Sequence, residues 1–294
     1  MHPRLRRLAA SSGLLAATLL LGTLAPGRPA LAQHPVPWEI GMQPAFSPIK
    51  QDIIELHDLV QVIITVITLF VAVLLAYVMF RYHHTRNPTP SRLSHHTWLE
   101  VTWTLAPVLI LVAIAIPSFR LVYYEDRTAT PDLTVKVTGH QWYWEYTYPD
   151  QNGLHFDSYI VPENQLKPGQ MRLLEVDNQL VLPAGKRIRI LETSADVIHS
   201  FFIPSLGVQR YAMPGRTIET WVEITRPGVY YGECNQVCGT NHSQMPISVH
   251  AVTPDEFTAW LAQAKTKFSQ GTAPAQTVAA AAAPSRLAVA QVEH

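Results

Sequence analysis

The chain has 294 residues, of which 48% are hydrophobic and 15% are charged, and its 22 basic and 22 acidic side chains cancel to a formal net charge of zero. This balance argues against a nucleic-acid partner, which would need a strongly basic surface. The only two cysteines are Cys234 and Cys238, so thiol chemistry is confined to one short segment.

Residues 1–32 have the three-part pattern of a cleaved secretory signal. Three arginines lie among the first seven residues, residues 14–24 are an apolar stretch, and an Ala-Leu-Ala sequence precedes Gln33. The apolar stretch is too short to span a membrane, which takes about 20 residues. We expect the mature chain to begin near Gln33 and, having lost four arginines and no acids, to be mildly acidic.

After a periplasmic N-terminal segment, residues 33–58, the chain is predicted to form a transmembrane hairpin within residues 59–122. Residues 59–80 and residues 101–119 contain no charged side chain. Each run is long enough to cross about 30 Å of hydrocarbon as a helix. Two such runs so close together are unusual in a soluble domain, which argues against the alternative of buried soluble helices.

The loop between the two runs, residues 81–97, sets the predicted orientation in the membrane. It has three arginines, four histidines and no acid. The positive-inside rule therefore places this loop in the cytoplasm and both ends of the mature chain in the periplasm of a bacterial inner membrane.

Residues 123–253 have the pattern of a soluble β domain. Short segments rich in β-branched and aromatic residues are separated by Pro-Gly or Asn turns, which predicts a sandwich or barrel. The predicted strands are residues 133–148, 171–176, 187–193, 217–224, 228–234 and 246–252. Such a domain can hold two distant loops, one around His199 and one around Cys234, at the same end.

The chain is predicted to end with a short helix and a tail. Thr253 and Glu256 have the spacing of a capping box, with proline at the first helical position, so we expect a helix over residues 254–268. Residues 269–294 are rich in alanine and proline and lack the apolar variety to pack, which predicts disorder.

A run of soft donors surrounds the cysteines. Cys234, Cys238, His242 and Met245 lie close together, and thiolate, imidazole and thioether donors together suit copper best. A disulfide is the common alternative in an exported protein, but it leaves His242 and Met245 unexplained. A single blue-copper site would leave one thiolate over. Two thiolates bridging two metal ions would use every donor and would need a second histidine, for which His199 is the best candidate.

Three motifs together resemble subunit II of haem-copper cytochrome c oxidases, in that family's order. They are Gly139-His-Gln-Trp-Tyr-Trp-Glu-Tyr146, Asp196-Val-Ile-His-Ser-Phe201 and the cysteine cluster. The resemblance extends from about Ile53 to about Phe268. It implies a bacterial, aa3-type subunit with a two-helix transmembrane hairpin followed by an all-β, cupredoxin-like periplasmic domain of Greek-key sandwich or barrel type.

The resemblance also implies a dinuclear copper centre, CuA, and a set of ligands. These are the bridging Cys234 and Cys238, the terminal His199 and His242, the weak ligand Met245 and the backbone carbonyl of Gln236. The family usually has a glutamate at the position of Gln236, where it helps bind magnesium or manganese at the boundary with subunit I. An amide is a poorer ligand for a hard dication than a carboxylate, so this third metal ion is in question here, whereas a backbone carbonyl is indifferent to the change.

Four further residues take roles from the resemblance. Trp142, otherwise a core aromatic, lies where cytochrome c docks and passes its electron. Glu100, otherwise a solvated flanking charge, marks the entrance of a proton pathway. Asp177 and Asp196 match acids that attract cytochrome c. The implied partners are subunit I, subunit III, cytochrome c and membrane lipid.

The function that the resemblance implies is electron transfer from cytochrome c through CuA to the haem of subunit I, where oxygen is reduced to water and protons are pumped. A membrane-tethered copper chaperone or thiol-disulfide protein is an alternative, but the strand-rich pattern and Met245 argue against it. A quinol oxidase subunit II would lack the copper ligands. A nitrous oxide reductase would be a much longer chain without the helical hairpin.

Overall fold

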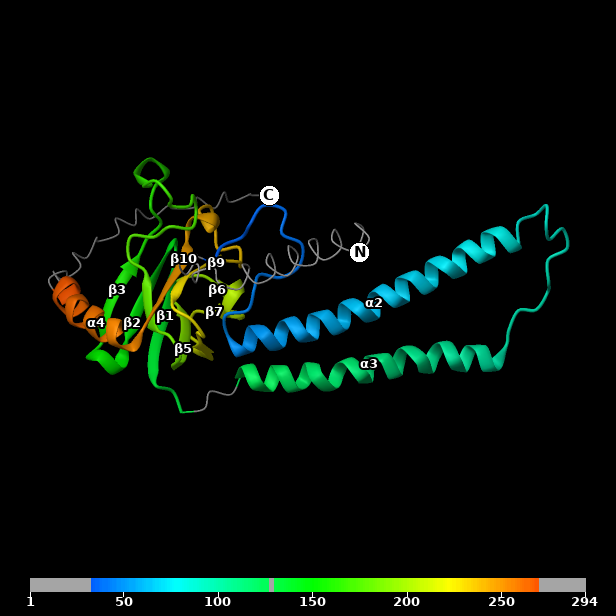
Figure 1. Ribbon diagram of the computed structural model, residues 1–294, viewed down its shortest axis with the longest axis horizontal. Helices are drawn as coiled ribbons and strands as arrows, with labels where there is room; N and C mark the ends of the chain where they lie inside the picture. Colours follow the sequence, from blue (N-terminus) through cyan, green and yellow to red (C-terminus); the bar gives the residue numbers. More distant parts are fainter. Residues whose placement is uncertain (1–32, 127–129, 270–294) are drawn as a thin grey trace, which may run out of the picture.

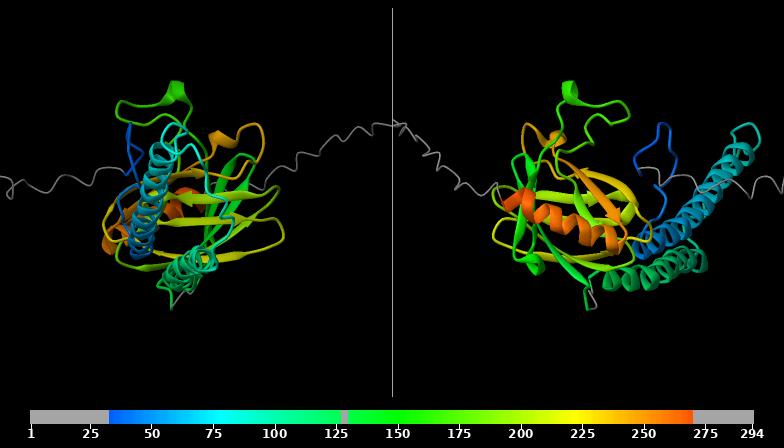
Figure 2. Two further views of the ribbon diagram at one scale, coloured as in Figure 1. Left: turned by 90° about the vertical axis from the view of Figure 1, so that its right-hand side faces the viewer. Right: turned by 60° about the vertical axis from the view of Figure 1, so that its left-hand side comes forward.

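The structure is a computed structural model that describes residues 33–126 and 130–269 as a β-rich head with a long two-helix arm (Figure 1). The predicted signal segment lies outside the described residues, and so do residues 270–294 of the predicted tail. Figure 2 shows the arm leaving one side of the head.

The arm consists of α2 (Pro48–Arg81) and α3 (Thr97–Asp126). Both helices are long and apolar enough to cross a membrane, with mean hydropathies of 2.9 and 2.3 over their most apolar windows and none of those windows buried in the protein. α2 starts well before the apolar run because Ser47 caps it and Pro48 occupies its first turn, where the missing N–H costs nothing. Each helix therefore continues beyond the apolar segment predicted from the sequence.

Contacts at the head end hold both helices. The Ser47 hydroxyl donates to the Leu206 carbonyl at 2.6 Å and accepts from the Lys50 N–H at 3.0 Å. The Trp221 indole N–H donates to the Tyr124 carbonyl at 3.0 Å, and the two rings meet edge to face with centroids 5.2 Å apart. The arm is thus joined to the head by polar contacts from both of its helices.

The head is a cupredoxin-like sandwich of two five-stranded sheets, with the strand orders β3-β2-β1-β5-β8 and β4-β10-β9-β6-β7. The strands are β1 (Leu133–His140), β2 (Tyr143–Tyr148), β3 (Leu154–Ser158), β4 (Leu180–Pro183), β5 (Arg187–Ser194), β6 (His199–Ile203), β7 (Val208–Ala212), β8 (Ile218–Glu223), β9 (Gly228–Cys234) and β10 (Pro246–Val252). The predicted fold class, two apolar helices followed by an all-β sandwich, is confirmed.

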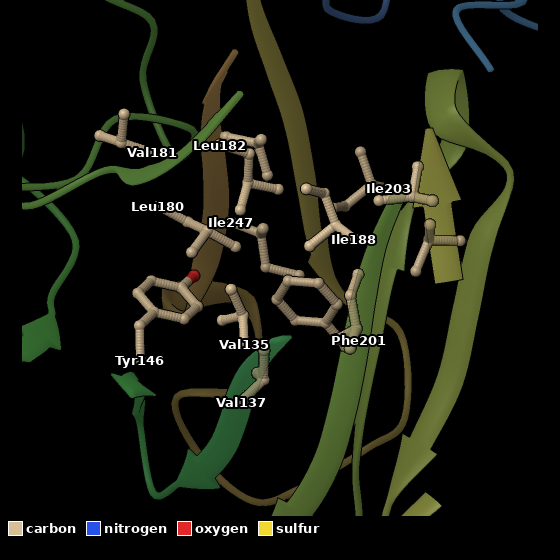
Figure 3. Packing of buried hydrophobic residues seen from close by; sticks show 14 of the residues in the cluster. Val135, Val137, Tyr146, Leu180, Val181, Leu182, Ile188, Phe201, Ile203 and Ile247 are labelled. Atoms are coloured by element: carbon tan, nitrogen blue, oxygen red, sulfur yellow. The ribbon is translucent and has the colours of Figure 1, made fainter. Parts of the chain in front are cut away.

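The core lies between the inward faces of the two sheets. Side chains alternate along each strand, so that Ile188 and Ile190 of β5 are buried while Arg187 and Arg189 point outward. Figure 3 shows Val135 and Tyr146 facing Ile247 and Phe201 across the sandwich. Phe201 packs edge-on against Tyr146 with ring centroids 6.4 Å apart. This rigid core fixes the positions of the strand ends that carry the candidate site.

Two of the predicted strands are wrong. Residues 133–148 form not one strand but a hairpin, because the chain turns at Gln141 and Trp142 between β1 and β2. Residues 171–176 form a turn, in which only Val176 makes an isolated bridge to Ile160. The segment is rich in apolar residues, as strands often are, but no neighbouring strand pairs with it.

The other predicted strands agree closely with the structure, whereas β3, β4, β6 and β7 were not predicted. Residues 228–234 and 246–252 coincide with β9 and β10. The four missed strands have only four or five residues each. Such short segments carry little periodicity of their own, and pairing with strands distant in the sequence decides their conformation.

The C-terminal helix α4 (Pro254–Ser269) packs against β3 of the first sheet and β4 of the second. The Glu256 carboxylate accepts from the Thr253 N–H at 2.9 Å and from its hydroxyl at 2.8 Å, as a capping box requires. Phe268 stacks on Phe156 of β3 with ring centroids 4.4 Å apart. The helix thereby covers the end of the sandwich around β3.

Gly232 of β9 lies where that strand crosses close to β6, so we expect Gly232→Ala to destabilise the head strongly. A Cβ at Gly232 would overlap the Phe202 carbonyl oxygen and lie 3.0 Å from Ile203 Cγ1. Overpacking of this kind costs about 1–3 kcal/mol or more. Thermal unfolding of the full chain in detergent should show a melting temperature lower by several degrees. The control is Gly153→Ala, where no atom lies within 4 Å of the added Cβ. This variant should lose less stability, because only the positive φ of +71° disfavours alanine there. Equal melting temperatures for the two variants would contradict the prediction.

Candidate metal centre

Potential metal ligands from distant parts of the chain meet at one end of the sandwich. His199 is the first residue of β6 and Cys234 is the last residue of β9, while Cys238, His242 and Met245 lie between β9 and the start of β10. The ligand atoms of His199, Cys234 and Cys238 lie within 4.8 Å of one another, and all three residues are buried. This group could hold a metal ion.

Cys238 lies at the centre of these donors. Its Sγ is 3.9 Å from the Cys234 Sγ, 3.5 Å from the His242 Nδ1 and 3.5 Å from the Met245 Sδ. Both cysteines are free, so the structure contains no disulfide between them. The Gln236 carbonyl oxygen is 3.3 Å from the Cys234 Sγ. The structure therefore brings together all six groups that the sequence analysis named as copper ligands.

A carboxylate orients the His199 ring. The His199 Nε2 lies 2.9 Å from the Asp196 Oδ1, while its Nδ1 is buried and has no hydrogen-bond partner in the described part of the chain. A ring held in this way presents Nδ1 as the metal-binding atom, which is the usual arrangement for a ligating histidine. The unpaired buried nitrogen is the observation that best fits a metal-ligating role for His199.

Asp196 is itself held by the backbone around it. Its carboxylate accepts from the Gln141 N–H at 2.7 Å and from the Val197 N–H at 2.6 Å. Partial burial raises the pKa of Asp196, but the hydrogen bonds from His199 and from these two N–H groups together outweigh burial and lower it. Asp196 is therefore ionised at neutral pH and suited to accept from the imidazole N–H. This structural task adds to the docking role predicted for it.

The Cys238 side chain is a protonated thiol at neutral pH. Burial, with a further contribution from Cys234, raises the pKa of Cys238 to about 12. Since metal ions bind the thiolate, loading the site must release protons.

The hairpin formed by β1 and β2 holds the loop between β9 and β10, which contains Cys238 and Met245, by two hydrogen bonds. The Gln141 Nε2 donates to the Cys238 carbonyl at 2.7 Å, and the Trp144 indole N–H donates to the Met245 carbonyl at 3.2 Å. Trp144 is fully buried and packs edge-on against His199, with ring centroids 5.9 Å apart. Neither Gln141 nor Trp144 was singled out from the sequence, although both lie in the motif that begins at Gly139.

The remaining predicted residues lie apart from the donor cluster. Trp142 is half-buried and covers the loop at Gly239, where an added Cβ would lie 2.9 Å from the indole Cζ2. Glu100 accepts from the His96 N–H at 3.1 Å and caps α3 at the opposite end of the arm. Asp177 is exposed and accepts from the Tyr159 N–H at 2.8 Å. These positions are compatible with the predicted roles and leave them as predictions.

Gly139→Ala should displace His199 and impair metal binding while leaving the fold intact. A Cβ at Gly139 would lie 2.8 Å from the His199 Cδ2 and 2.9 Å from its Cγ, closer than carbon atoms approach in proteins. The ring would have to rotate away from the thiols, because the backbone on both sides is held in β1 and β6. Copper titration of the full chain should show at least about a tenfold loss of affinity, typical of a disturbed ligand orientation. An unchanged affinity would show that His199 is not a ligand.

The fold and the donor cluster define a class of protein: a membrane-anchored, cupredoxin-like domain with a buried centre of thiolate, imidazole and thioether donors. Comparison with known families identifies the class more closely. The description "Cytochrome C oxidase subunit II, transmembrane domain" matches residues 35–121, and "Cytochrome C oxidase subunit II, periplasmic domain" matches residues 133–252. The chain belongs to the cytochrome c oxidase subunit II family, and it is therefore a membrane protein and a subunit of a haem-copper oxidase.

Two relatives that match this chain over most of their own length support this assignment. The "Probable cytochrome c oxidase subunit 2" of Rickettsia bellii is 46% identical over 231 residues, which cover 79% of this chain and 86% of the relative. The "Cytochrome c oxidase subunit 2" of Arabidopsis thaliana is also 46% identical, over 76% of this chain and 89% of the relative. A crystal structure of the periplasmic domain of subunit II from Bradyrhizobium japonicum is 45% identical with a TM-score of 0.45, covering 48% of this chain and 99% of that chain.

Proposed function

We propose that this chain is the subunit through which electrons enter a bacterial, proton-pumping cytochrome c oxidase. Cytochrome c docks on the head, and the chain holds a dinuclear copper centre, CuA, between this docking surface and the haem of subunit I. The observation that carries the proposal is the buried donor cluster. A ring nitrogen of His199 lies within 4.8 Å of two free thiols, and the buried His199 Nδ1 has no hydrogen-bond partner among the described residues.

The donor set fits copper better than other metals. Cys234 and Cys238 would bridge two copper ions, His199 and His242 would bind one each, and Met245 and the Gln236 carbonyl would complete the shell. When bound, a thiolate-bridged copper pair supplies a one-electron redox centre. The protein's own part is to keep the donors buried and oriented, since the Asp196 carboxylate fixes one imidazole and the Trp144 indole holds the Met245 backbone. For magnesium or manganese, Gln236 offers no carboxylate, so we propose no such ion here.

The positions of the other predicted residues support a route across the subunit. Trp142 covers the loop that follows Cys238 and would receive the electron, while Asp177 and Asp196 would steer cytochrome c by charge. Glu100, at the far end of α3, would mark a proton pathway into subunit I. The arm would pack in the inner membrane against subunits I and III and lipid, with the copper-bearing head in the periplasm.

Copper analysis with electron paramagnetic resonance on the purified full chain tests the proposal. Two copper ions per chain, with one unpaired electron shared equally between two copper nuclei, are the expected result. One copper ion or none, together with an oxidised Cys234–Cys238 pair, would contradict the proposed CuA centre.

A further inference from the structure

A carboxyl group that the metal centre does not use is enclosed in the head. Glu192 lies on β5 and follows Ile188 and Ile190 on the inward face of that strand, where it is 0% exposed. The residues opposite it in the sheet, Val137 on β1 and Ile218 on β8, are apolar. Neither carboxyl oxygen of Glu192 has a hydrogen-bond partner in the described part of the chain. An ionised carboxylate in such a place would be strongly destabilising unless a cation paired with it.

The cation whose charge acts on Glu192 is Arg210 on β7. Its guanidinium is paired with other carboxylates. Its Nη2 lies 2.7 Å from the Asp126 Oδ1 and its Nη1 lies 3.8 Å from the Glu125 Oε2, both at the end of α3. The Arg210 guanidinium thus pairs with two carboxylates of α3 and also attracts the negative charge of an ionised Glu192. Burial raises the pKa of Glu192 well above its ordinary value, and the attraction of Arg210 offsets only part of this effect.

No other described cation compensates Glu192. Lys50 of α2 and Glu39 line the same groove as Glu125 and Arg210. The Lys50 Nζ, however, donates to the Met42 Sδ at 3.4 Å. Arg187 and Arg189 of β5 point to the opposite face of the sheet, where they pair with Glu223 and Glu219. Among the described residues, Arg210 is therefore the cation that acts on the charge of Glu192.

We propose that Glu192 is a proton-binding site, occupied at neutral pH, and that it ionises only when Arg210 leaves the acids at the end of α3. On ionisation the carboxylic O–H bond breaks, the proton passes to water, and the guanidinium exchanges its α3 partners for the Glu192 carboxylate. The ion pairs of Arg210 with Glu125 and Asp126 join the head to α3 of the arm. Loss of the proton from Glu192 would therefore weaken this connection between the head and the arm. This inference does not depend on copper.

Infrared spectroscopy of the full chain in detergent, with carbon-13-labelled glutamate, tests the first part of the proposal. At neutral pH the native chain should show the carbonyl band of a protonated carboxylic acid, and Glu192→Gln should lack this band. The matched control is Glu219→Gln, since Glu219 lies on the neighbouring strand with its carboxylate 3.3 Å from Arg189; this variant should keep the band. Identical native and Glu192→Gln spectra would mean that Glu192 is ionised and would overturn the proposal.

The role of Arg210 is tested by removing its other partners. In the double variant Glu125→Gln, Asp126→Asn, the guanidinium is free to pair with Glu192, so the pH at which the acid band disappears should fall by about 1–3 units. An unchanged midpoint would show that Arg210 does not govern ionisation of Glu192.

Stability measured against pH gives an independent check in case a variant folds poorly. A carboxyl group whose folded-state pKa is raised leaves the protein most stable below the unfolded-state value of 4.5, and stability falls as the pH rises from there toward the folded-state pKa. The melting temperature of the native chain and of Glu219→Gln should fall over this window. In Glu192→Gln this component should be absent, and an equal fall in all three proteins would count against the proposal.

Discussion

Cys238→Ser is expected to abolish the dinuclear copper centre. Cys238 Sγ lies 3.9, 3.5 and 3.5 Å from the Cys234, His242 and Met245 donors, so its loss removes the group that these three donors share. A serine hydroxyl is nearly isosteric but stays protonated and is a hard donor, which copper disfavours. The purified variant should contain one copper ion or none, should lack the signal of an electron shared by two nuclei, and should accept electrons from cytochrome c only at background rate.

The control for Cys238→Ser is Ser243→Ala, in the same loop. Ser243 is exposed and belongs to no predicted ligand set, so this variant should keep two copper ions and normal electron acceptance. If Cys238→Ser kept both copper ions and the shared electron, the bridging role of Cys238 would be wrong.

Trp142→Leu is expected to slow electron acceptance from reduced cytochrome c while leaving the copper signal unchanged. Trp142 is half-buried over the loop that follows Cys238, and none of its atoms belongs to the donor cluster. Truncating a central aromatic of a docking surface costs about 2–4 kcal/mol, which corresponds to roughly 30-fold to 1,000-fold. Stopped-flow oxidation of reduced cytochrome c by the assembled oxidase measures the rate of electron acceptance, which should fall by this factor.

Trp144→Leu is the contrasting variant. Trp144 is fully buried, packs against His199 and donates to the Met245 carbonyl. Its loss should alter the copper signal and lower the melting temperature, because a cavity and an unpaired carbonyl would be left beside the ligands. If Trp142→Leu changed the copper signal as much as Trp144→Leu, the two tryptophans would not have the separate roles proposed here.

Much of the architecture could be read from local patterns. The two uncharged apolar runs identified the helices of the arm, since length and composition alone decide whether a helix can cross a membrane. The Thr253–Glu256 capping box predicted the start of α4 for a similarly local reason. The short strands β3, β4, β6 and β7 escaped prediction, and residues 171–176 were wrongly assigned to a strand. Pairing partners far along the chain determine strands of this length, and a short window of sequence does not contain them.

The donor types of the candidate site were determined by the sequence itself. Two thiols, an imidazole and a thioether within one short segment restrict the metal whatever the fold, because ligand softness is a property of the residues. Their arrangement was decided only by the tertiary structure. It placed His199 beside Cys234, turned Asp196 toward the imidazole and left Gly139 no room for a Cβ. Likewise, no pattern near Glu192 in the sequence indicates that the charge of Arg210 acts on it while Arg210 pairs with acids at the end of α3. These residues are distant in the sequence, and only the packing of the sandwich and the arm brings them together.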